Sequence, residues 1–588
     1  MSLVAAPLAG SSSRADLARP NADRRTAVAS VACVGVCALV LLAPFEALDP
    51  LLTLPGQSLS TVEAAIVVAL GGWMLATIAM RVVPIWRSPL TLPWLSVLVA
   101  MSVAAVAAPE HGANAWNMVG RGVFAFLIYL LALNAVASER YFLAVMVAAT
   151  VSGLFVWPFV LFEYAQVTPV TRLLSHFRAF SANVGGALRA SGPFQYPTIA
   201  SMYLEIVFCL ALGLFLFSVD RRKHGLSILI GIAIVALGQA ISLTSSRAGL
   251  AVMLLAFSIV GLARLRRGRF DAGTQGLVAI AVLIGIQFPT TSAFQNLGLR
   301  LTTEGQSAWY SVSFDVPIEV TMPTEAVVSV PVRVTNTGLT VWNSATTPPF
   351  RLSYHLLLDD NRVLSWQGLR TDFPRPVHPG EAMTLSASVE APARPGRYRI
   401  MWDIEREGWL WFSTEPGAPM FVTNAVVTGP DIGPVGVPYE TKLPASPSRP
   451  GRPLLWRAGL GIFFAHPLSG VGPDNYRLTY GPYAGLVNFD TRIHSNNMYL
   501  EILSGSGLIG AAAFGWLCCG IGVLSVAALR NRRLPATGMA VAIAMGAIAI
   551  HGVVDSFLGF TPTYVLYSVT AGLLAGLPVV VRNDAHRI

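Results

Sequence analysis

The stretch that organises the chain begins where a long polar region ends and an apolar run follows. It reads Arg492-Ile493-His494-Ser495-Asn496-Asn497-Met498-Tyr499-Leu500-Glu501. The next stretch, Leu503-Ser504-Gly505-Ser506-Gly507-Leu508-Ile509-Gly510, is rich in small residues, which let neighbouring transmembrane helices approach closely. This order predicts that the imidazole of His494 lies at a membrane surface, where it can meet both a lipid-borne group and a water-soluble one.

The composition is that of a polytopic membrane protein. Of the 588 residues, 54% are hydrophobic and 12% are charged, which is about half the charge fraction of an average soluble chain. The mean hydropathy is +0.59. The formal net charge of +9 comes from basic residues in short clusters between apolar runs, which is typical of membrane topology. We therefore expect contact with membrane lipids and no nucleic-acid partner.

The cysteines indicate neither a disulfide framework nor a metal site. All five lie in apolar runs, the polar insert contains no cysteine, and no two cysteines have the CxxC spacing of a metal site. They are Cys33, Cys37, Cys209, Cys518 and Cys519. The first apolar stretch follows a polar, Arg-containing segment without a convincing cleavage site, which favours a retained first span over a signal peptide.

Apolar stretches of about 17 to 25 residues predict twelve membrane spans. They lie near 27–44, 61–80, 90–108, 120–137, 141–163, 198–218, 225–243, 248–264, 276–291, 500–528, 535–556 and 563–581. The basic clusters between them fall on one side, which predicts cytoplasmic termini and an outer location for the loop 164–197 and for 292–499. The expected fold is an all-α polytopic membrane protein with a long outer insert.

The insert changes character near Ala308, where alternating apolar and polar residues replace continuous hydrophobicity. Four segments read as strands with one buried face, and turn-forming residues separate them. The segments are Val327–Val334, Phe350–Leu356, Met383–Val389 and Gly396–Ile404. Several short strands at this spacing suggest an all-β sandwich of roughly 110 residues.

Motifs in the insert resemble a bacterial immunoglobulin-like module. They are Val334-Thr335-Asn336-Thr337-Gly338 with Trp342, Pro379-Gly380-Glu381, Pro395-Gly396-Arg397-Tyr398 and Trp409-Leu410-Trp411-Phe412. Trp366, Trp409 and Trp411 have the chemistry to stack on sugar rings, although aromatic residues in a sandwich more often belong to the core.

The expected order of segments along the chain is a cytoplasmic tail (1–26), nine helices (27–300), an immunoglobulin-like sandwich (308–424), a stiff Pro-rich linker (425–453), an outer catalytic segment (454–499), three helices (500–581) and a second cytoplasmic tail (582–588).

Two arginines are candidate anion ligands on the outer side. Arg247 follows Thr244-Ser245-Ser246 between two apolar runs with almost no loop, so it is expected at the membrane boundary. A cation there normally has an anionic partner or reaches for head groups, and the guanidinium fork suits a phosphate. The alternative is a snorkelling side chain that anchors the helix. Arg189 brings a second cation from the loop before the sixth span.

Other polar side chains border the same region. His494 is the candidate for acid–base chemistry because an imidazole titrates near neutral pH, and the alternative is a hydrogen-bonded interfacial histidine. Arg457 lies in a segment with helical apolar spacing, suited to the membrane interface. For Arg477, a solvated surface position is the favoured interpretation.

The ordered motifs of the membrane part resemble the O-antigen ligase and polymerase superfamily. They are Arg189 with Gly192-Pro193-Phe194, Ser246-Arg247, His466-Pro467-Leu468-Ser469-Gly470-Val471-Gly472, His494-Ser495-Asn496-Asn497 with Leu500, and Gly507-Leu508-Ile509-Gly510. Each motif alone is unspecific, and their order and spacing carry the match. With the bounds taken from the predicted spans, the resemblance covers roughly residues 27–300 and 450–581, and it does not cover the sandwich.

The resemblance implies an inverting glycosyltransferase of the GT-C type that needs no metal and no cofactor. It would act at the periplasmic face of the bacterial inner membrane on a glycan carried by undecaprenyl diphosphate. By this likeness His494 would be the general base or the residue that orients the acceptor, and Arg247 and Arg189 would hold the diphosphate with help from Arg492. Asn496, Asn497 and Arg457 would contact the acceptor or support the site.

The acceptor stays open at this point. A ligase passes the glycan to lipid A–core, a polymerase passes it to another lipid-linked glycan, and a relative passes it to protein hydroxyls. The insert could select among these or dock a partner of a polysaccharide assembly system. A flippase for a lipid-linked sugar is the competing class, but no duplicated motif is apparent. A metal-dependent transferase using Glu46 and Asp49 rests on one weak carboxylate pair.

Overall fold

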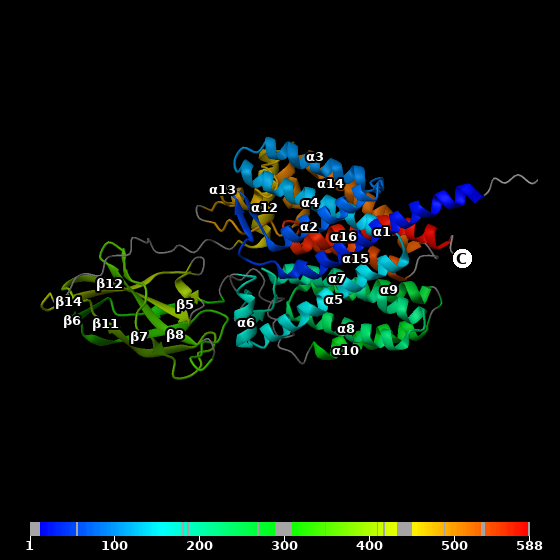
Figure 1. Ribbon diagram of the computed structural model, residues 1–588. Coiled ribbons are helices and arrows are strands. Elements are labelled where there is room, and N and C mark those ends of the chain that lie inside the picture. The colour runs from blue at the N-terminus through cyan, green and yellow to red at the C-terminus, as the bar shows by residue number, and fades with distance from the viewer. Residues whose placement is uncertain are drawn as a thin grey trace, which may run out of the picture.

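A computed structural model describes most of the chain. The described residues are 12–54, 57–178, 182–184, 187–266, 268, 270–288, 309–346, 349–407, 410–414, 418–431, 450–486, 489–530 and 536–585. They form a helical part and a β-sandwich, and Figure 1 shows the sandwich beside α6 (Thr168–Leu174) at one end of the helices. The end of α16 (Thr561–Ala585) lies at the opposite end.

Helices occupy all twelve places at which the sequence predicts spans. They are α1 (Ser12–Leu42), α2 (Thr61–Ala79), α3 (Thr91–Val106), α4 (Gly112–Ala135), α5 (Glu139–Tyr164), α7 (Pro197–Asp220), α8 (His224–Leu243), α9 (Arg247–Arg266), α10 (Ala272–Gln287), α14 (Met498–Arg530), α15 (Ala536–His551) and α16. Within the described residues, eight helices are long and apolar enough to cross a membrane, and α3, α10 and α15 are shorter apolar helices. A polytopic membrane fold is therefore supported, and the count of twelve spans stays a prediction.

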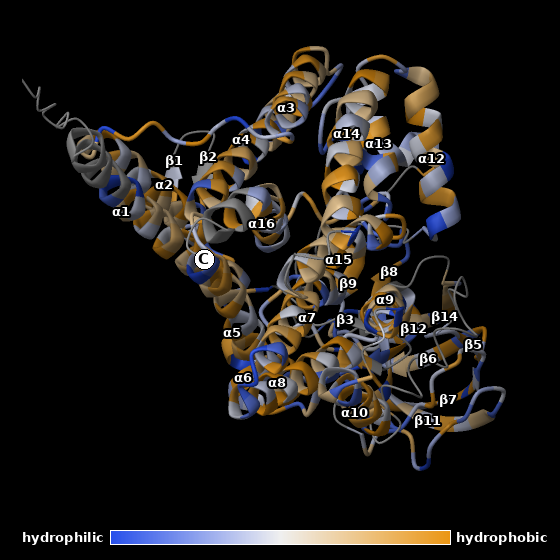
Figure 2. Ribbon diagram, turned by 90° about the vertical axis from the view of Figure 1, so that its right-hand side faces the viewer, coloured by the Kyte–Doolittle hydropathy of each residue, from blue (hydrophilic) through white to orange (hydrophobic). Residues whose placement is uncertain are grey.

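Some of the helices begin where a polar side chain accepts hydrogen bonds from free backbone N–H groups. Ser60 and Glu63 form a reciprocal capping box at the start of α2, and Ser138 caps α5. Between such polar ends the helix surfaces are largely apolar, as the orange ribbons of Figure 2 show. α7 is the most enclosed of the candidate spans, with 89% of its most apolar window buried. It packs against α5, α8 and α15 and forms the centre of the helical core.

Two details differ from the sequence-based expectations. The predicted outer loop 164–197 contains the short helix α6 and a hairpin of β3 (Ala182–Val184) and β4 (Ala187–Arg189). α14 begins at Met498, before the small-residue stretch, and contains non-helical backbone angles at Gly507 within that stretch, so a kink divides the helix there. After α1, two short strands pair as a further hairpin, β1 (Leu52–Leu54) with β2 (Gln57–Leu59).

The insert folds as two facing sheets. The larger has the order β10-β8-β12-β14-β6, with β9 on β8 and β13 on β12, and the smaller has the order β11-β7-β5. The strands are β5 (Val312–Asp315), β6 (Glu319–Pro323), β7 (Val327–Asn336), β8 (Phe350–Leu358), β9 (Val363–Ser365), β10 (Thr371–Asp372), β11 (Ala382–Glu390), β12 (Gly396–Arg406), β13 (Leu410–Trp411) and β14 (Phe421–Thr428). The four strands predicted from the sequence are confirmed as β7, β8, β11 and β12.

The sandwich has its own apolar core, separate from that of the helices. β7 and β11 alternate buried and exposed residues, as expected for a sheet with one solvated face. Trp342 is fully buried in this core. On the outer face of the larger sheet, Trp366 stacks on the buried His355 at 3.7 Å between ring centroids, and Trp411 lies at 4.5 Å. These two tryptophans therefore pack internally, and Trp409 lies outside the described residues.

Candidate functional site

The segment before α14 is folded by its own side chains. Asn497 is the cap residue, and its Oδ1 accepts a hydrogen bond from the Leu500 N–H at 3.0 Å. Ser495 Oγ donates to the Asn497 carbonyl oxygen at 2.9 Å. Asn496 adopts a left-handed backbone conformation with φ of 52°. These local contacts turn the chain so that the preceding residue, His494, faces the first turn of α14.

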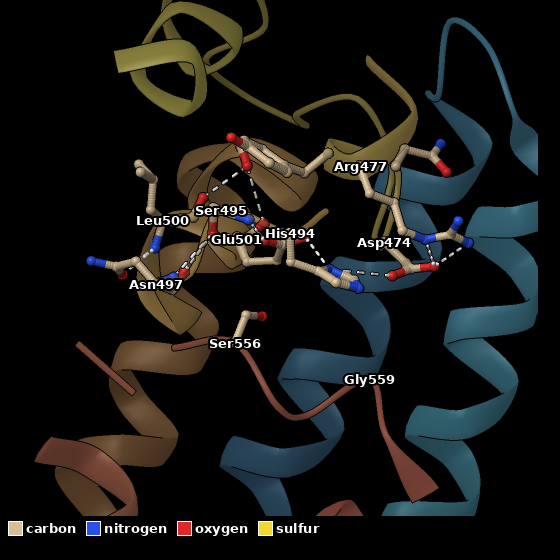
Figure 3. A network of polar contacts seen from close by, with 12 residues as sticks. Asp474, Arg477, His494, Ser495, Asn497, Leu500, Glu501, Ser556 and Gly559 are labelled. Carbon is tan, nitrogen blue, oxygen red and sulfur yellow. Dashed lines mark hydrogen bonds and ion pairs between the residues drawn. The ribbon is translucent and has the colours of Figure 1, made fainter. Parts of the chain in front are cut away.

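Glu501 on that first turn fixes the imidazole of His494. His494 Nδ1 lies 3.0 Å from Glu501 Oε1, and the other carboxylate oxygen accepts hydrogen bonds from the Ser495 N–H at 2.9 Å and hydroxyl at 2.7 Å. Because an ionised carboxylate only accepts, Nδ1 carries a hydrogen and the second ring nitrogen, Nε2, is left for another partner. Figure 3 shows the ring between Glu501 and Asp474.

A second polar group joins the His494 segment to the start of α4. Asp474 Oδ1 lies 4.0 Å from His494 Nδ1, and Asp474 Oδ2 accepts hydrogen bonds from Arg477 and Asn114 at 3.0 and 3.1 Å. Arg477 also donates to Asn114 Oδ1 at 2.8 Å and to the Thr491 carbonyl oxygen at 3.1 Å. The interpretation of Arg477 as a solvated surface residue is therefore wrong, because its guanidinium is used inside this network.

The surroundings change the proton affinity of His494. Burial lowers the pKa of the imidazole, but the Glu501 carboxylate attracts the imidazolium and accepts its hydrogen bond, and Asp474 adds to this effect. Together they outweigh both burial and the opposing charge of Arg477, so the pKa is raised above its ordinary value. His494 is thus a stronger base than a free imidazole.

His494 lies where two hollows of different character meet. The first, the apolar cavity, has a volume of about 130 Å³ and is lined mainly by α3, α4, α14 and α16, with Trp94, Phe514 and Tyr567 among its walls. The second, the polar pocket, has a volume of about 380 Å³. Both are lined by Arg121, Asp474, His494, Gly559 and Phe560. An amphipathic ligand could therefore place an apolar part and a polar part on either side of the imidazole.

Sequence reasoning missed several residues of the polar pocket. Arg121 on α4 donates to the Gly559 carbonyl oxygen at 3.1 Å and lies 4.0 Å from Glu63. Glu46 lines the same pocket, and burial raises the pKa of its carboxyl, partly offset by hydrogen bonds from Ser60 and Thr561. The sequence did offer one signal for this pocket: Arg121 is a charged residue within the apolar sequence of a predicted span.

Arg189 and Arg247 lie together, in a different hollow. This arginine pocket has a volume of about 290 Å³ and is lined by Arg189, Thr198, Ser246, Arg247, Ala248, Arg452, His551, Val554 and Asp555. Arg189 Nε donates to the Thr244 carbonyl oxygen at 3.1 Å, which ties β4 to the turn before α9. The structure thus brings together two arginines that are far apart in sequence and adds Arg452 from the start of α12 (Arg452–Ala465).

A buried ion pair holds the loop that follows Arg189. Glu163, near the end of α5, lies 2.6 Å from Arg178 and accepts hydrogen bonds from the Ser191 and Gly192 N–H groups at 3.0 and 2.6 Å. Arg178 also donates to the Ser191 hydroxyl. Both charged side chains are at least 96% buried. The position of Arg189 is therefore fixed from both sides of its segment.

The remaining predicted residues are more exposed. Arg492 lines the polar pocket with His494 and forms a two-pronged ion pair with Asp490, with both atom pairs at 2.8 Å. Arg457 is exposed on α12. Asn497 has the structural role of a helix cap, whereas the positive φ of Asn496 shapes the turn.

Within the described residues, one group has the donor types and spacing for a metal ion. It consists of Asp474, His494 and Glu501, whose ligand atoms lie within 4.8 Å of one another. The fit is poor, because Arg477 already pairs with Asp474 and Ser495 occupies one oxygen of Glu501. A divalent ion would also compete with the hydrogen bond between His494 and Glu501.

The comparison with protein families identifies the class of this site. Residues 444–515, which include α12, the His494 segment and the first half of α14, match the O-Antigen ligase family model. This segment of the chain is therefore similar to the O-antigen ligase family. The match supports glycan transfer of the ligase or polymerase type, and the matched segment includes His494, Glu501 and Asp474.

The other comparisons carry no functional argument. No curated protein matches the chain. Among solved structures, the Pseudomonas fluorescens alkylpurine DNA glycosylase AlkC bound to DNA containing an abasic site analog matches with 11% identity. The match covers 57% of this chain and 97% of that chain at a TM-score of 0.14, which is too low to indicate a shared fold.

Proposed function

We propose that the protein transfers a glycan from undecaprenyl diphosphate to an acceptor hydroxyl at the periplasmic face of the bacterial inner membrane. The observation that carries this proposal is the position of His494. Its Nδ1 is held by Glu501, and the residue lines both the apolar cavity between helices and the polar pocket. A base at such a junction suits two substrates, one of which is anchored in lipid.

The arginine pocket is suited to the donor diphosphate. Arg189, Arg247 and Arg452 line it, and guanidinium groups bind phosphate oxygens in pairs. Next to it, an apolar groove of about 280 Å³ follows α9, α14 and α15. α9 begins with Arg247 and α15 ends with His551, so both helices lead from the arginine pocket into this groove. We place the isoprenoid tail of the donor there.

The chemistry follows from these positions. The acceptor hydroxyl gives its proton to His494 Nε2 while its oxygen attacks the anomeric carbon of the donor sugar from the side opposite the diphosphate, which inverts that carbon. The bond to the diphosphate breaks and the leaving group keeps the electron pair. Guanidinium groups in a partly dehydrated pocket stabilise the charge of that leaving group better than water does. Glu501 stabilises the imidazolium that forms.

The direct test uses purified protein in detergent with a glycan on undecaprenyl diphosphate and EDTA. Lipid A–core and a second lipid-linked glycan are offered separately, and product size is followed. We expect transfer that needs His494 and survives EDTA. Transfer to lipid A–core identifies a ligase, and a ladder of lengthening lipid-linked glycan identifies a polymerase. Transfer lost with EDTA and restored by a divalent ion would contradict the metal-free chemistry.

Replacing Arg247 by Lys tests the diphosphate assignment. Lys keeps the charge but lacks the planar fork, so we expect transfer to fall at least about tenfold, the loss of roughly one charge-assisted hydrogen bond. Arg266→Lys at the exposed far end of the same helix, α9, is the matched control and should keep full turnover. Full turnover of the Arg247→Lys protein would remove Arg247 from the donor site.

The alternatives give different results in these assays. A protein O-oligosaccharyltransferase would use neither lipid acceptor but would modify an added protein acceptor. A flippase or a scaffold that docks a polysaccharide assembly partner through the sandwich would give no product and would tolerate loss of His494.

A further inference from the structure

A second histidine–carboxylate pair lies inside the helical core, and the chemistry proposed above does not use it. His551 Nδ1 lies 3.0 Å from both carboxylate oxygens of Glu205 on α7. Their side chains are 1% and 0% exposed. Buried ionisable groups at membrane depth are costly, so their presence in a predicted span points to a function.

The contacts around Glu205 fix the tautomer of His551. The Ser201 hydroxyl donates to Glu205 Oε1 at 2.7 Å, so this carboxylate acts as an acceptor. His551 Nδ1 must therefore carry a hydrogen, and Nε2 is the ring atom that can serve another group. Gly249 on α9 packs against the pair so closely that an added Cβ would lie 2.8 Å from Glu205 Oε1. α9 thus encloses the carboxylate of α7 that holds the ring.

The imidazole forms part of the wall of the arginine pocket. His551 lines this pocket with Arg189, Arg247, Arg452 and Asp555. Arg452 and Asp555 are close enough to act electrostatically on the ring, as is Glu205. Among the described residues, three guanidinium groups and the Asp555 carboxylate line the pocket, and the Glu205 carboxylate lies behind the ring, so a protonated His551 would add positive charge to this wall. A diphosphate in the pocket would in turn favour the imidazolium.

His551 is also joined to the His494 segment through the backbone. The Met498 N–H donates to the carbonyl oxygens of Gly552 at 2.7 Å and Asp555 at 3.0 Å. Gly552 directly follows His551, and Met498 is the first residue of α14. The two histidines thus lie on either side of one short backbone contact. A diphosphate at His551 would therefore be near the acceptor at His494.

From this geometry we infer that His551, held by Glu205, takes up a proton when the lipid diphosphate binds and donates a hydrogen bond from Nε2 to a phosphate oxygen. The inference rests on the proposed donor site in the arginine pocket. Protonated His551 would be the fourth cationic partner of the diphosphate, after the three arginines of the pocket, and it would become charged only when the diphosphate binds. On release of the diphosphate product, the proton returns to solvent.

Calorimetry with farnesyl diphosphate tests this directly. Binding to the purified full chain is measured at mildly alkaline pH in two buffers with different ionisation enthalpies, which gives the number of protons taken up. We expect uptake by the wild type and none by His551→Gln, with affinity about 10- to 100-fold weaker, the effect of losing a charge-assisted hydrogen bond. His224→Gln, at the exposed start of α8, is the control and should match the wild type.

The outcomes distinguish failure of the proposed donor site in the arginine pocket from failure of the role assigned to His551. If Arg247→Ala binds farnesyl diphosphate as the wild type does, the proposed donor site itself fails. If Arg247→Ala loses binding while His551→Gln keeps both affinity and proton uptake, only the role of His551 is overturned. Should His551→Gln not fold, Glu205→Gln replaces it, and unchanged uptake in that variant overturns the inference equally.

Discussion

At the scale of single residues, the paired contacts of His494 explain how a base can work beside a lipid. Glu501 accepts a hydrogen bond from Nδ1–H, and Asp474 lies close enough to favour the imidazolium. Without these carboxylates, burial would make the ring a weaker base.

Replacing His494 by Ala should therefore lower transfer by about 10²- to 10⁴-fold, the usual contribution of a positioned base, with normal membrane insertion. Normal product from this variant at normal protein level would remove His494 from the mechanism.

The raised pKa of His494 predicts the pH dependence of transfer. A general base must be unprotonated, so kcat/KM should increase with pH through a midpoint above that of an ordinary histidine, about 6.5. Glu501→Gln removes the main charge that raises this pKa, so its midpoint should move to lower pH while its maximal rate falls. Initial rates across a pH series measure both midpoints. An unchanged midpoint in Glu501→Gln would contradict the coupling of the two residues.

At the scale of elements, the break in α14 positions the loop that carries Asp474. Val471 and Gly472 donate to the carbonyl oxygens of Ser504 and Gly505 at 3.1 and 2.9 Å, and Leu508 donates to that of Pro467 at 2.9 Å. This backbone pairing requires small residues on both sides. At Gly507, where φ is 60°, an added Cβ would lie 2.3 Å from the Leu468 carbonyl group.

Gly507→Ala should therefore destabilise the protein and abolish transfer. The backbone angles of Gly507, φ 60° and ψ −161°, lie in a region that is essentially confined to glycine and cost about 1–3 kcal/mol for a residue with a Cβ, and the clash with Leu468 adds to that. The melting temperature in detergent, followed by intrinsic fluorescence, measures the effect. The matched control is Gly515→Ala on the same helix, where an added Cβ meets open space and the melting temperature should not fall. Equal melting temperatures for the two variants would contradict the argument.

The Glu163 clamp gives a second test at this scale. Glu163→Gln leaves the buried guanidinium of Arg178 without its counter-charge, and breaking a buried pair typically costs about 3–5 kcal/mol. We expect a lower melting temperature and, because the Arg189 loop loosens, weaker binding of farnesyl diphosphate. Glu139→Gln on the same helix breaks only the exposed pair with Arg221 and should cost about 0–1 kcal/mol. If Glu163→Gln binds the diphosphate normally, the clamp does not position Arg189.

At the scale of the whole molecule, local sequence patterns located the elements but not their long-range partners. Hydrophobic runs placed every helix predicted as a span, and alternation placed the four strands. The pairs that build the site are different, because Asn114 and Asp474 are separated by 360 residues and Glu205 and His551 by 346. No periodicity encodes such contacts, since they depend on how the helices pack. The motifs drew attention to His494 and Arg247 as candidates, whereas the contacts of Glu501, Asp474 and His551 became apparent only from the fold.

The two separate cores predict that the sandwich folds independently of the helices. Most of its core residues come from the strands between Val312 and Thr428, and Trp342 joins them from the connection between β7 and β8. We expect residues 309–431, expressed alone, to be soluble and β-rich with one cooperative unfolding transition. Trp342→Ala should destabilise this fragment by about 3–5 kcal/mol, because it leaves a cavity in the core. Ile318→Ser, at a side chain that is 84% exposed, is the control and should unfold as the unmodified fragment does. A fragment that aggregates or unfolds without cooperativity would show that the sandwich depends on the helices for its stability.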